Sequence, residues 1–308
     1  MSFALATVRL NSGPTPVLEA HVRHYVLSEV APELLASSPE RGLMNLFPRW
    51  DRVEKELVRL VERLETGETG VIAAPGIYDY MTPLQYPAKV VLGGANYYEH
   101  MHKEVGLPDF RKEDGMPVFF LKPPSTSLVG CGKTVRYPAQ SSKFDWEIEL
   151  AVVIGRTLRR ASDEEAANAV AGYAVGIDLS ARDWQLNPKH PFKFDLFAGK
   201  AFDDSCPLGP KIVPSRFVDP GNLQLKLLVN GELKQNANTS DMIWSPEEQI
   251  AAVSQHLTLE PGDILLTGTP AGVGLATGEY LKVGDIIEAE IDGLGTLKIQ
   301  IKPDTASQ

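Results

Sequence analysis

Short apolar runs separated by glycine and proline dominate the chain after residue 88. Their length and their content of valine, isoleucine and leucine are typical of strands. Asn230 and Gly231, between two such runs, indicate a tight β-hairpin. The predicted strands lie within residues 89–95, 118–124, 144–155, 172–179, 223–233, 262–268, 284–291 and 296–301.

Helical spacing of apolar residues is confined to a few segments. From about Arg49 to Leu64, apolar side chains recur on one face with Glu and Arg between them, which predicts a packing helix. Two more helices are predicted at 162–171 and 245–256, because each begins at a serine that can cap it and continues with acidic residues.

The first 85 residues differ from the rest in their pattern of apolar and polar residues. Residues 15–36 have a mixed apolar pattern, and the long predicted helix follows them. Residues 67–87 are rich in turn-forming residues, which predicts a connector between domains. We therefore expect a small N-terminal domain, 1–85, and a larger domain, 86–308. Strands outnumber helices in the larger part, so the expected class is mostly β (α+β), with a curled sheet.

Composition excludes several classes of protein. Thirty Lys and Arg against 40 Asp and Glu give a net charge of −10, which argues against binding nucleic acid or an anionic membrane. No apolar run reaches the roughly 18 residues of a membrane span, and no signal-peptide pattern opens the chain. Cys131 and Cys206 make neither a disulfide framework nor a zinc motif, so we expect a cytoplasmic protein.

Carboxylates alternate with apolar residues along one predicted strand. Asp145, Glu147 and Glu149 share a face, and the strand continues into the apolar residues 151–154. Buried like charges are costly unless a cation joins them, and oxygen ligands suit Mg²⁺, Mn²⁺ or Ca²⁺. The alternative is a solvated strand face on which the carboxylates only add solubility.

A third carboxylate favours the metal site. Asp178 ends the apolar strand 172–178, and a polar stretch, 179–185, follows it. Two glutamates at i and i+2 with an aspartate on a neighbouring strand would make a three-carboxylate site with open positions. Asp178 alone is weak evidence, since acids often begin loops.

Other segments carry candidate acid–base and binding groups. On a helix His100 and Glu104 lie on one face, which suits a general base, although a surface helix explains them equally well. Lys122 and Lys200 each sit among apolar residues, either as surface lysines or as buried cations beside an anion.

A glycine-rich loop, 268–274, follows the predicted strand 262–268. No helix is expected after it, so we reject dinucleotide binding and expect the loop to present Thr269 and backbone N–H groups to a carboxylate. The absence of GxSxG argues against a serine hydrolase.

Seven motifs over residues 88–302 together resemble the fumarylacetoacetate hydrolase family. In order they are GxNYxxH, FLKPxS, DxExELAVVIG, GYxxxxDxSARDxQ, GKxFDxxCPxGP, LxVNGExxQ and GDIxxTGTPxGVG. The resemblance implies that the larger domain is a twisted β-roll catalytic domain. It also implies a small-molecule 2-oxo acid as substrate and a homodimer.

The resemblance assigns roles to residues at matching positions. The implied metal ligands are Glu147, Glu149 and Asp178, holding Mg²⁺ or Mn²⁺, with Ca²⁺ a further candidate. Lys200 is implied to be catalytic, and the implied substrate-binding residues are Lys122, Arg182, Gln185 and Thr269. The family's catalytic pair is a histidine with a glutamate three residues later. The resemblance implies that this pair lies on a lid over the substrate, and we expect residues 97–115 to form that lid. Here Glu104 lies four residues after His100, so the lid carries an extra residue and His102 is the fallback.

Three functions remain open at this point. The first is a metal-dependent hydrolase that cleaves a C–C bond of a 2,4-dioxo acid, such as an acylpyruvate or fumarylpyruvate, through a pyruvate enolate. The second is a decarboxylase, isomerase or hydratase of a related 2-oxo acid such as oxaloacetate. The third is a binding protein without catalytic activity.

Overall fold

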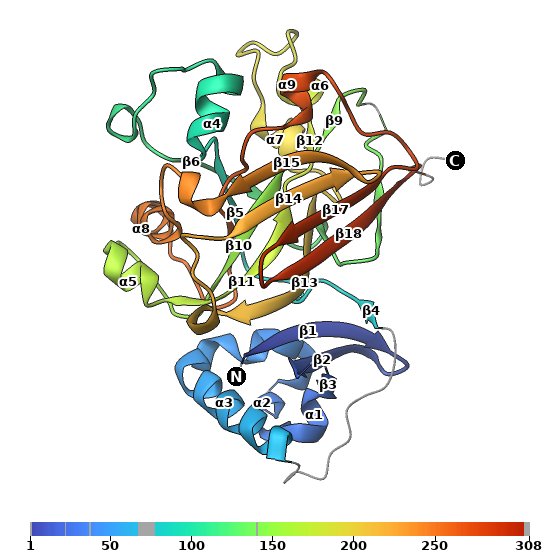
Figure 1. The fold of residues 1–308 in the computed structure, drawn as a ribbon, viewed down its shortest axis with the longest axis vertical. Helices are drawn as coiled ribbons and strands as arrows, with labels where there is room; N and C mark the ends of the chain where they lie inside the picture. Colours follow the sequence, from blue (N-terminus) through green and yellow to red (C-terminus); the bar gives the residue numbers. More distant parts are fainter. Residues whose placement is uncertain (1, 22, 37, 67–77, 140, 305–308) are drawn as a thin grey trace.

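One long mixed sheet runs through the molecule (Figure 1). The computed structural model describes residues 2–21, 23–36, 38–66, 78–139 and 141–304. The order within the long sheet is β3-β2-β1-β13-β11-β10-β16-β5-β6, with β4 paired to β1 and β7 to β13. Its strands are β1 Phe3–Leu10, β2 Gly13–Ala20, β3 Arg23–Val26, β4 Asp79–Tyr80, β5 Val90–Gly94, β6 Val118–Lys122, β7 Leu128–Val129, β10 Ile148–Ile154, β11 Val170–Ile177, β13 Cys206–Pro214 and β16 Ile264–Leu266.

A second sheet packs on the centre of the first, with the order β15-β14-β17-β18-β8. Its hairpin turns at Asn230 and Gly231, which have φ angles of 53° and 81°, as the Asn-Gly pair predicts. The short strands β9 and β12 form a separate pair. These strands are β8 Thr134–Arg136, β9 Phe144–Asp145, β12 Ser180–Ala181, β14 Gln224–Val229, β15 Glu232–Asn238, β17 Ile286–Ile291 and β18 Gly295–Lys302.

The central strands are buried on both faces, because each face meets a different layer. Leu150 and Val152 of β10 belong to the core shared with the second sheet. Ala151 and Val153 belong to the core that includes α3 and β1. This explains the unbroken apolar run after Glu149, and the mostly β, mixed α+β class predicted from the sequence is confirmed.

Helices gather at both ends of the molecule: α1, α2 and α3 at one end, and α4, α6, α7 and α9 at the other (Figure 1). The α-helices are α1 Leu27–Val30, α2 Pro32–Leu35, α3 Trp50–Thr66, α4 Tyr98–His100, α5 Asp163–Ala167, α6 Arg182–Gln185, α7 Leu196–Lys200, α8 Pro246–His256 and α9 Gly274–Thr277. A π-helical turn spans Met101–Val105, and 3₁₀ turns span Pro39–Asn45, Phe47–Arg49, Lys112–Asp114, Ser215–Phe217 and Thr239–Asp241. No helix among the described residues is both long and apolar enough to cross a membrane.

Two sequence predictions about helices are wrong in detail. The helix predicted at 162–171 ends at Ala167, because the chain enters β11 at Val170 and pairs there with Ile154. A short helix, α9, does follow the glycine-rich loop where none was expected, and it spans four residues. Four residues are too few to leave a periodic pattern in the sequence.

The N-terminal residues share the long sheet and one core with the rest of the chain. β1 pairs with β13 through Leu5 and Ile212, and the buried side chains of Phe47 and Leu57 lie in the same core as Val153. The first part of the predicted connector, 67–77, lies outside the described residues, and within its remainder β4 pairs with β1. The division into domains 1–85 and 86–308 stays a prediction.

Candidate active site

Antiparallel pairing of β10 with β11 brings two of the predicted carboxylates together. Ile148, the first residue of β10, pairs with Ile177, the last residue of β11. Glu147 therefore lies opposite Asp178, and the Asp178 amide donates to the Glu147 carbonyl oxygen at 2.9 Å. Glu149 follows two residues after Glu147 and so projects from the same face. Strand register, rather than a local motif, assembles the cluster.

The three carboxylates can hold a metal ion. One oxygen from each of Glu147, Glu149 and Asp178 lies within 4.8 Å of the others, and all three residues are buried. Glu149 Oε2 accepts from the Gly268 amide at 2.7 Å, whereas the buried Oε1 has no hydrogen-bond partner. A buried carboxylate oxygen without a partner, beside two others, is the donor set that hard divalent cations take. The residues present therefore fit a divalent metal.

Charge at the cluster supports this fit. Burial and the nearby Asp178 and Glu147 raise the pKa of Glu149 well above its usual range. Burial also raises the pKa of Asp178, although Lys122 and Lys200 oppose it. At Glu147, Arg182 and Lys200 outweigh the effect of burial and lower the pKa to about 2. Within the described part of the chain, Glu147 and Asp178 thus form ion pairs with cationic side chains, whereas Glu149 forms none.

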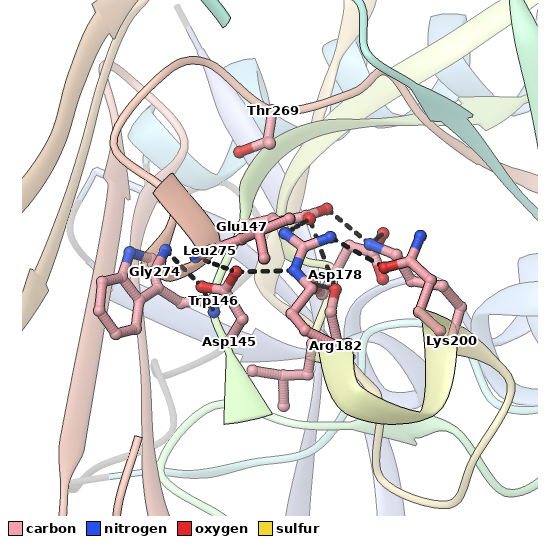
Figure 2. Close-up of polar contacts among 12 residues, drawn as sticks. Asp145, Trp146, Glu147, Asp178, Arg182, Lys200, Thr269, Gly274 and Leu275 are labelled. Carbon is pink, nitrogen blue, oxygen red and sulfur yellow. Dashed lines mark hydrogen bonds and ion pairs between the residues drawn. The ribbon is translucent and has the colours of Figure 1, made fainter. Parts of the chain in front are cut away.

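Lys200 lies between two of the carboxylates. Its ammonium donates to Glu147 Oε2 at 2.8 Å and to Asp178 Oδ2 at 2.6 Å (Figure 2). It ends α7, a helix capped by the Asp195 side chain, which accepts from the Ala198 amide. α7 packs against α6 at Gly199, where an added Cβ would lie 2.3 Å from the Gln185 Cβ. Glycine in the GKxFD motif thus lets α7 approach closely enough to deliver Lys200.

Arg182 binds the carboxylate cluster from the other side. β12 pairs with β9, and this pairing places α6 beside Asp145. Arg182 Nε donates to Asp145 Oδ2 at 2.7 Å, and its Nη2 contacts Glu147 (Figure 2). The remaining guanidinium nitrogen, Nη1, donates to Gln185 Oε1 at 3.1 Å.

Asp145 does not join the three-carboxylate cluster, although the alternating pattern put it on the same face. The strand breaks between β9 and β10, so the period of two is interrupted after Asp145. Besides Arg182, its carboxylate accepts from the amides of Trp146, Gly274 and Leu275 at 2.6–2.9 Å. It therefore fixes Arg182 and the start of α9.

Lys122 does not reach the cavity, contrary to its expected role in binding substrate. Its side chain is completely buried, and its ammonium donates to the carbonyl oxygens of Leu179 and Ser205 at 2.9 and 2.7 Å. It also forms an ion pair with Asp178 Oδ1 at 2.7 Å. Lys122 is thus a buried cation behind Asp178, and it faces a protein carboxylate rather than a ligand.

Thr269 stands on the glycine-rich loop over the carboxylates (Figure 2). Its hydroxyl donates to the Ile148 carbonyl oxygen and accepts from Gln235 Nε2, both at 2.8 Å. Gln235 is buried, and its Oε1 accepts from the Ile148 amide. Sequence reasoning gave Gln235 no role, although it is the glutamine of the LxVNGExxQ motif and holds this loop against β10.

The His100–Glu104 pair forms on the lid segment. Asn96 anchors the start of this segment by donating to the carbonyl oxygens of Trp244 and Thr267 at 2.9 and 2.8 Å. His100 Nδ1 lies 2.6 Å from Glu104 Oε2, and Glu104 Oε1 accepts from the Gly272 amide at 2.8 Å. A π-helical turn takes up one residue more than an α-helical turn, which accommodates the extra residue in the lid.

His102 points elsewhere. Its Nε2 lies 3.0 Å from the Phe110 carbonyl oxygen, and it is absent from the lining of the cavity described next. The structure therefore brings His100 and Glu104 to the site and leaves the fallback histidine outside it.

A cavity of about 570 Å³ connects these groups. His100 and Glu104 line it together with the carboxylates of Glu147 and Asp178. Its other polar lining residues are Arg182, Gln185, Lys200 and Thr269. A carboxylate cluster, a neighbouring lysine and a histidine–glutamate pair lie together on one cavity, an arrangement typical of an enzyme active site.

Comparison with known proteins agrees with this class. The fumarylacetoacetate (FAA) hydrolase C-terminal family matches residues 89–302, and the chain belongs to this family. The mitochondrial oxaloacetate tautomerase fahd2 of Xenopus laevis is 39% identical over 255 residues, which are 78% of this chain and 77% of that protein. The resemblance stated from the motifs is confirmed.

Solved structures extend the likeness over nearly the whole chain. Fumarylacetoacetate hydrolase from Exiguobacterium antarcticum has a TM-score of 0.80 and 29% identity, covering 98% of this chain and 100% of that one. Maleylpyruvate hydrolase from Sphingobium sp. SYK-6, solved with manganese(II) and pyruvate, has a TM-score of 0.74 and 28% identity, covering 98% and 100%. Proteins similar to this chain thus include both hydrolases and tautomerases.

Proposed function

We propose that this chain is a divalent-metal-dependent enzyme that acts on 2-oxo acids through a pyruvate-type enolate, and that it hydrolyses the C–C bond of an acylpyruvate. We favour hydrolysis over the other reactions of this enolate because the His100–Glu104 pair lines the same cavity as the carboxylate cluster. Decarboxylation and tautomerisation form the same enolate, but neither needs an attacking water.

The residues that would hold the metal are Glu147, Glu149 and Asp178, with Mg²⁺ or Mn²⁺ as the proposed ion and Ca²⁺ as a third candidate. When bound, such an ion supplies a Lewis acid that polarises the carboxylate and keto oxygens of the substrate. Lys200 places a positive charge where the enolate develops, and a fixed charge in a dry site stabilises that state strongly. Arg182, Gln185 and Thr269 orient the substrate from the cavity wall.

The His100–Glu104 pair would activate water. With Nδ1–H donated to Glu104, the other ring nitrogen is the proton acceptor. His100 takes a proton from water as the water oxygen attacks the C4 carbonyl carbon. The C3–C4 bond then breaks, its electron pair becomes the enolate, and C4 leaves as a carboxylic acid. His100 then gives the proton that it took from water to C3 of the enolate, which yields pyruvate and restores the neutral imidazole.

Oxaloacetate tautomerisation is the second candidate. It is favoured by the 39% identity to the Xenopus laevis protein over 78% of this chain. Tautomerisation moves a proton between C3 and the keto oxygen, and His100 alone could carry that proton. The two candidates differ in whether Glu104 and a water are needed.

Substitutions in the lid separate the candidates. We expect His100→Ala and Glu104→Gln to lower acylpyruvate hydrolysis by about 10²–10⁴-fold, the usual contribution of general-base catalysis. His102→Ala is the matched control and should retain activity, because His102 bonds to Phe110 outside the cavity. Loss of the acylpyruvate enol absorbance is the measurement, with oxaloacetate tautomerisation assayed in parallel. Full hydrolytic activity in Glu104→Gln would contradict the hydrolase proposal and favour the tautomerase.

We further propose a cytoplasmic homodimer. Cys131 and Cys206 are both free thiols, which suits a reducing compartment. β6 is the edge of the long sheet and exposes Val118 and Leu121, an apolar edge that a second copy would cover. Light scattering should give twice the chain mass, and Leu121→Lys should shift it towards the mass of one chain. An unchanged mass in that variant would place the interface elsewhere.

A further inference from the structure

Besides its polar groups, the cavity is lined by ten described residues with apolar side chains. Six of them, from β6, α7, α9 and the loop between α6 and α7, are defined together as the distal wall. The distal wall consists of Val118, Phe120, Leu186, Phe194, Leu196 and Leu275. Cavities of a few hundred Å³ with mostly apolar walls bind ligands well above the size of a four-carbon acid.

Cations lining this cavity are already committed to the carboxylate cluster. Among the described residues, Arg182 and Lys200 are the lysines and arginines in the lining. Arg182 pairs with Asp145 and Glu147, and Lys200 pairs with Glu147 and Asp178. Both therefore serve the end of the substrate that approaches the cluster.

The loop between α6 and α7 does not supply a spare cation to the distal wall. Its basic residues Lys189, His190 and Lys193 are absent from the cavity lining, and His190 lies 3.3 Å from Asp195. Glu104 adds a negative charge to the cavity. A second carboxylate on a substrate would meet apolar carbon and the negative charge of Glu104, and both lining cations are already paired with protein carboxylates.

We infer that the distal wall binds an uncharged, apolar acyl group, so that the substrates are 2,4-dioxo acids with an aliphatic or aromatic acyl end. Substrates with a second carboxylate, such as fumarylpyruvate or oxaloacetate, are disfavoured. This inference deepens the proposed function and rests on it for the chelating end of the substrate. It departs from what the names of the similar tautomerases state.

Binding of 2-oxo acids that cannot be hydrolysed tests the wall independently of turnover. With the Mn²⁺-loaded protein, calorimetry would compare 2-oxopentanoate, 2-oxohexanoate and 2-oxooctanoate with the dicarboxylates 2-oxoglutarate and 2-oxoadipate. We expect about fourfold tighter binding for each added CH₂ that the wall covers. The dicarboxylates should bind at least about tenfold more weakly than the monocarboxylates of matched length, because their second charge shares the cavity with Glu104 and finds no unpaired cation there. Equal or tighter binding of the dicarboxylates would overturn the inference.

Turnover distinguishes failure of the inference from failure of the proposed function. Hydrolysis of benzoylpyruvate and hexanoylpyruvate would be compared with that of fumarylpyruvate. If none of these is hydrolysed while the binding order holds, the hydrolase proposal fails and the assignment of the wall stands. If fumarylpyruvate is the best substrate, the assignment of the wall is wrong although the chain is a hydrolase.

A charge added to the wall should reverse the preference. Phe194→Arg introduces a cation beside the bound acyl group, and we expect it to weaken 2-oxohexanoate binding and tighten 2-oxoadipate binding, each by about tenfold or more. Phe192→Arg is the matched control, since Phe192 lies on the same loop, is 89% exposed and does not line the cavity. An equal response of both variants would show that general surface charge, rather than the wall, sets the preference.

Discussion

Replacing Glu149 by glutamine is expected to abolish metal binding and turnover while leaving the metal-free protein at least as stable as the wild type. The buried Oε1 of Glu149 has no partner, and burial beside two other carboxylates raises the pKa of this group. Its negative charge therefore costs free energy in the metal-free state, and a neutral amide of the same shape removes that cost. The same change removes the charge that a divalent cation needs.

Metal affinity in Glu149→Gln should fall by more than about 100-fold, because even residues that only support a metal ligand contribute 10–100-fold. Elemental analysis and the shift in melting temperature on adding Mn²⁺ would measure the loss. Glu290→Gln, on an exposed position of β17, is the control and should keep both the metal and the shift. Unchanged metal content in Glu149→Gln would show that the ion is held elsewhere.

Lys122→Met is expected to be the most destabilising substitution near the site. The methionine side chain has nearly the same length, but it cannot replace the donors to Leu179 and Ser205 or the ion pair with Asp178. Removing one partner of a buried ion pair leaves an uncompensated charge and costs about 3–5 kcal/mol. For a chain of this size that corresponds to a fall in melting temperature of roughly 5–8 °C.

Thermal unfolding with and without Mn²⁺ would test this expectation. The loss should be smaller with the metal, since a cation beside Asp178 supplies part of the missing charge, whereas the two carbonyl oxygens stay unpaired. Lys226→Met, at an exposed position of β14, is the control and should change stability by no more than about 0.5 kcal/mol. A melting temperature within about 2 °C of the wild type would contradict the placement of Lys122 as a structural cation.

The cluster of Glu147, Glu149 and Asp178 could be predicted from sequence because its position depends on strand period and strand ends. Glu147 and Glu149 are two residues apart, and Asp178 follows an apolar strand, so simple pairing of neighbouring strands brings them together. Asp145 could not be separated from them, since the break after β9 leaves no mark in the alternating pattern.

Other features could not be predicted from the sequence pattern. A lysine at the end of an apolar run gives the same pattern whether its ammonium reaches solvent or is buried, as in Lys122, and only the tertiary fold determines which occurs. The sequence placed His100 and Glu104 on one face only on the condition that a helical turn forms, and it gave no sign that part of this turn is π-helical. Gln235 acts through the backbone of β10, a partner far away in sequence.

The glycine-rich loop after β16 binds side chains through its main chain. Amides of Gly268, Gly272, Gly274 and Leu275 donate to Glu149, Glu104 and Asp145. Alanine scanning does not detect such contacts, because alanine keeps the backbone amide hydrogen, and proline removes it only by also restricting the backbone. At Gly272, where φ is +103°, an added Cβ would lie 2.2 Å from the Lys234 carbonyl oxygen, so a mutant would report a steric clash instead. Isolating these contacts takes backbone chemistry, such as an amide-to-ester replacement at position 272, which removes the N–H and adds no atom to the side chain.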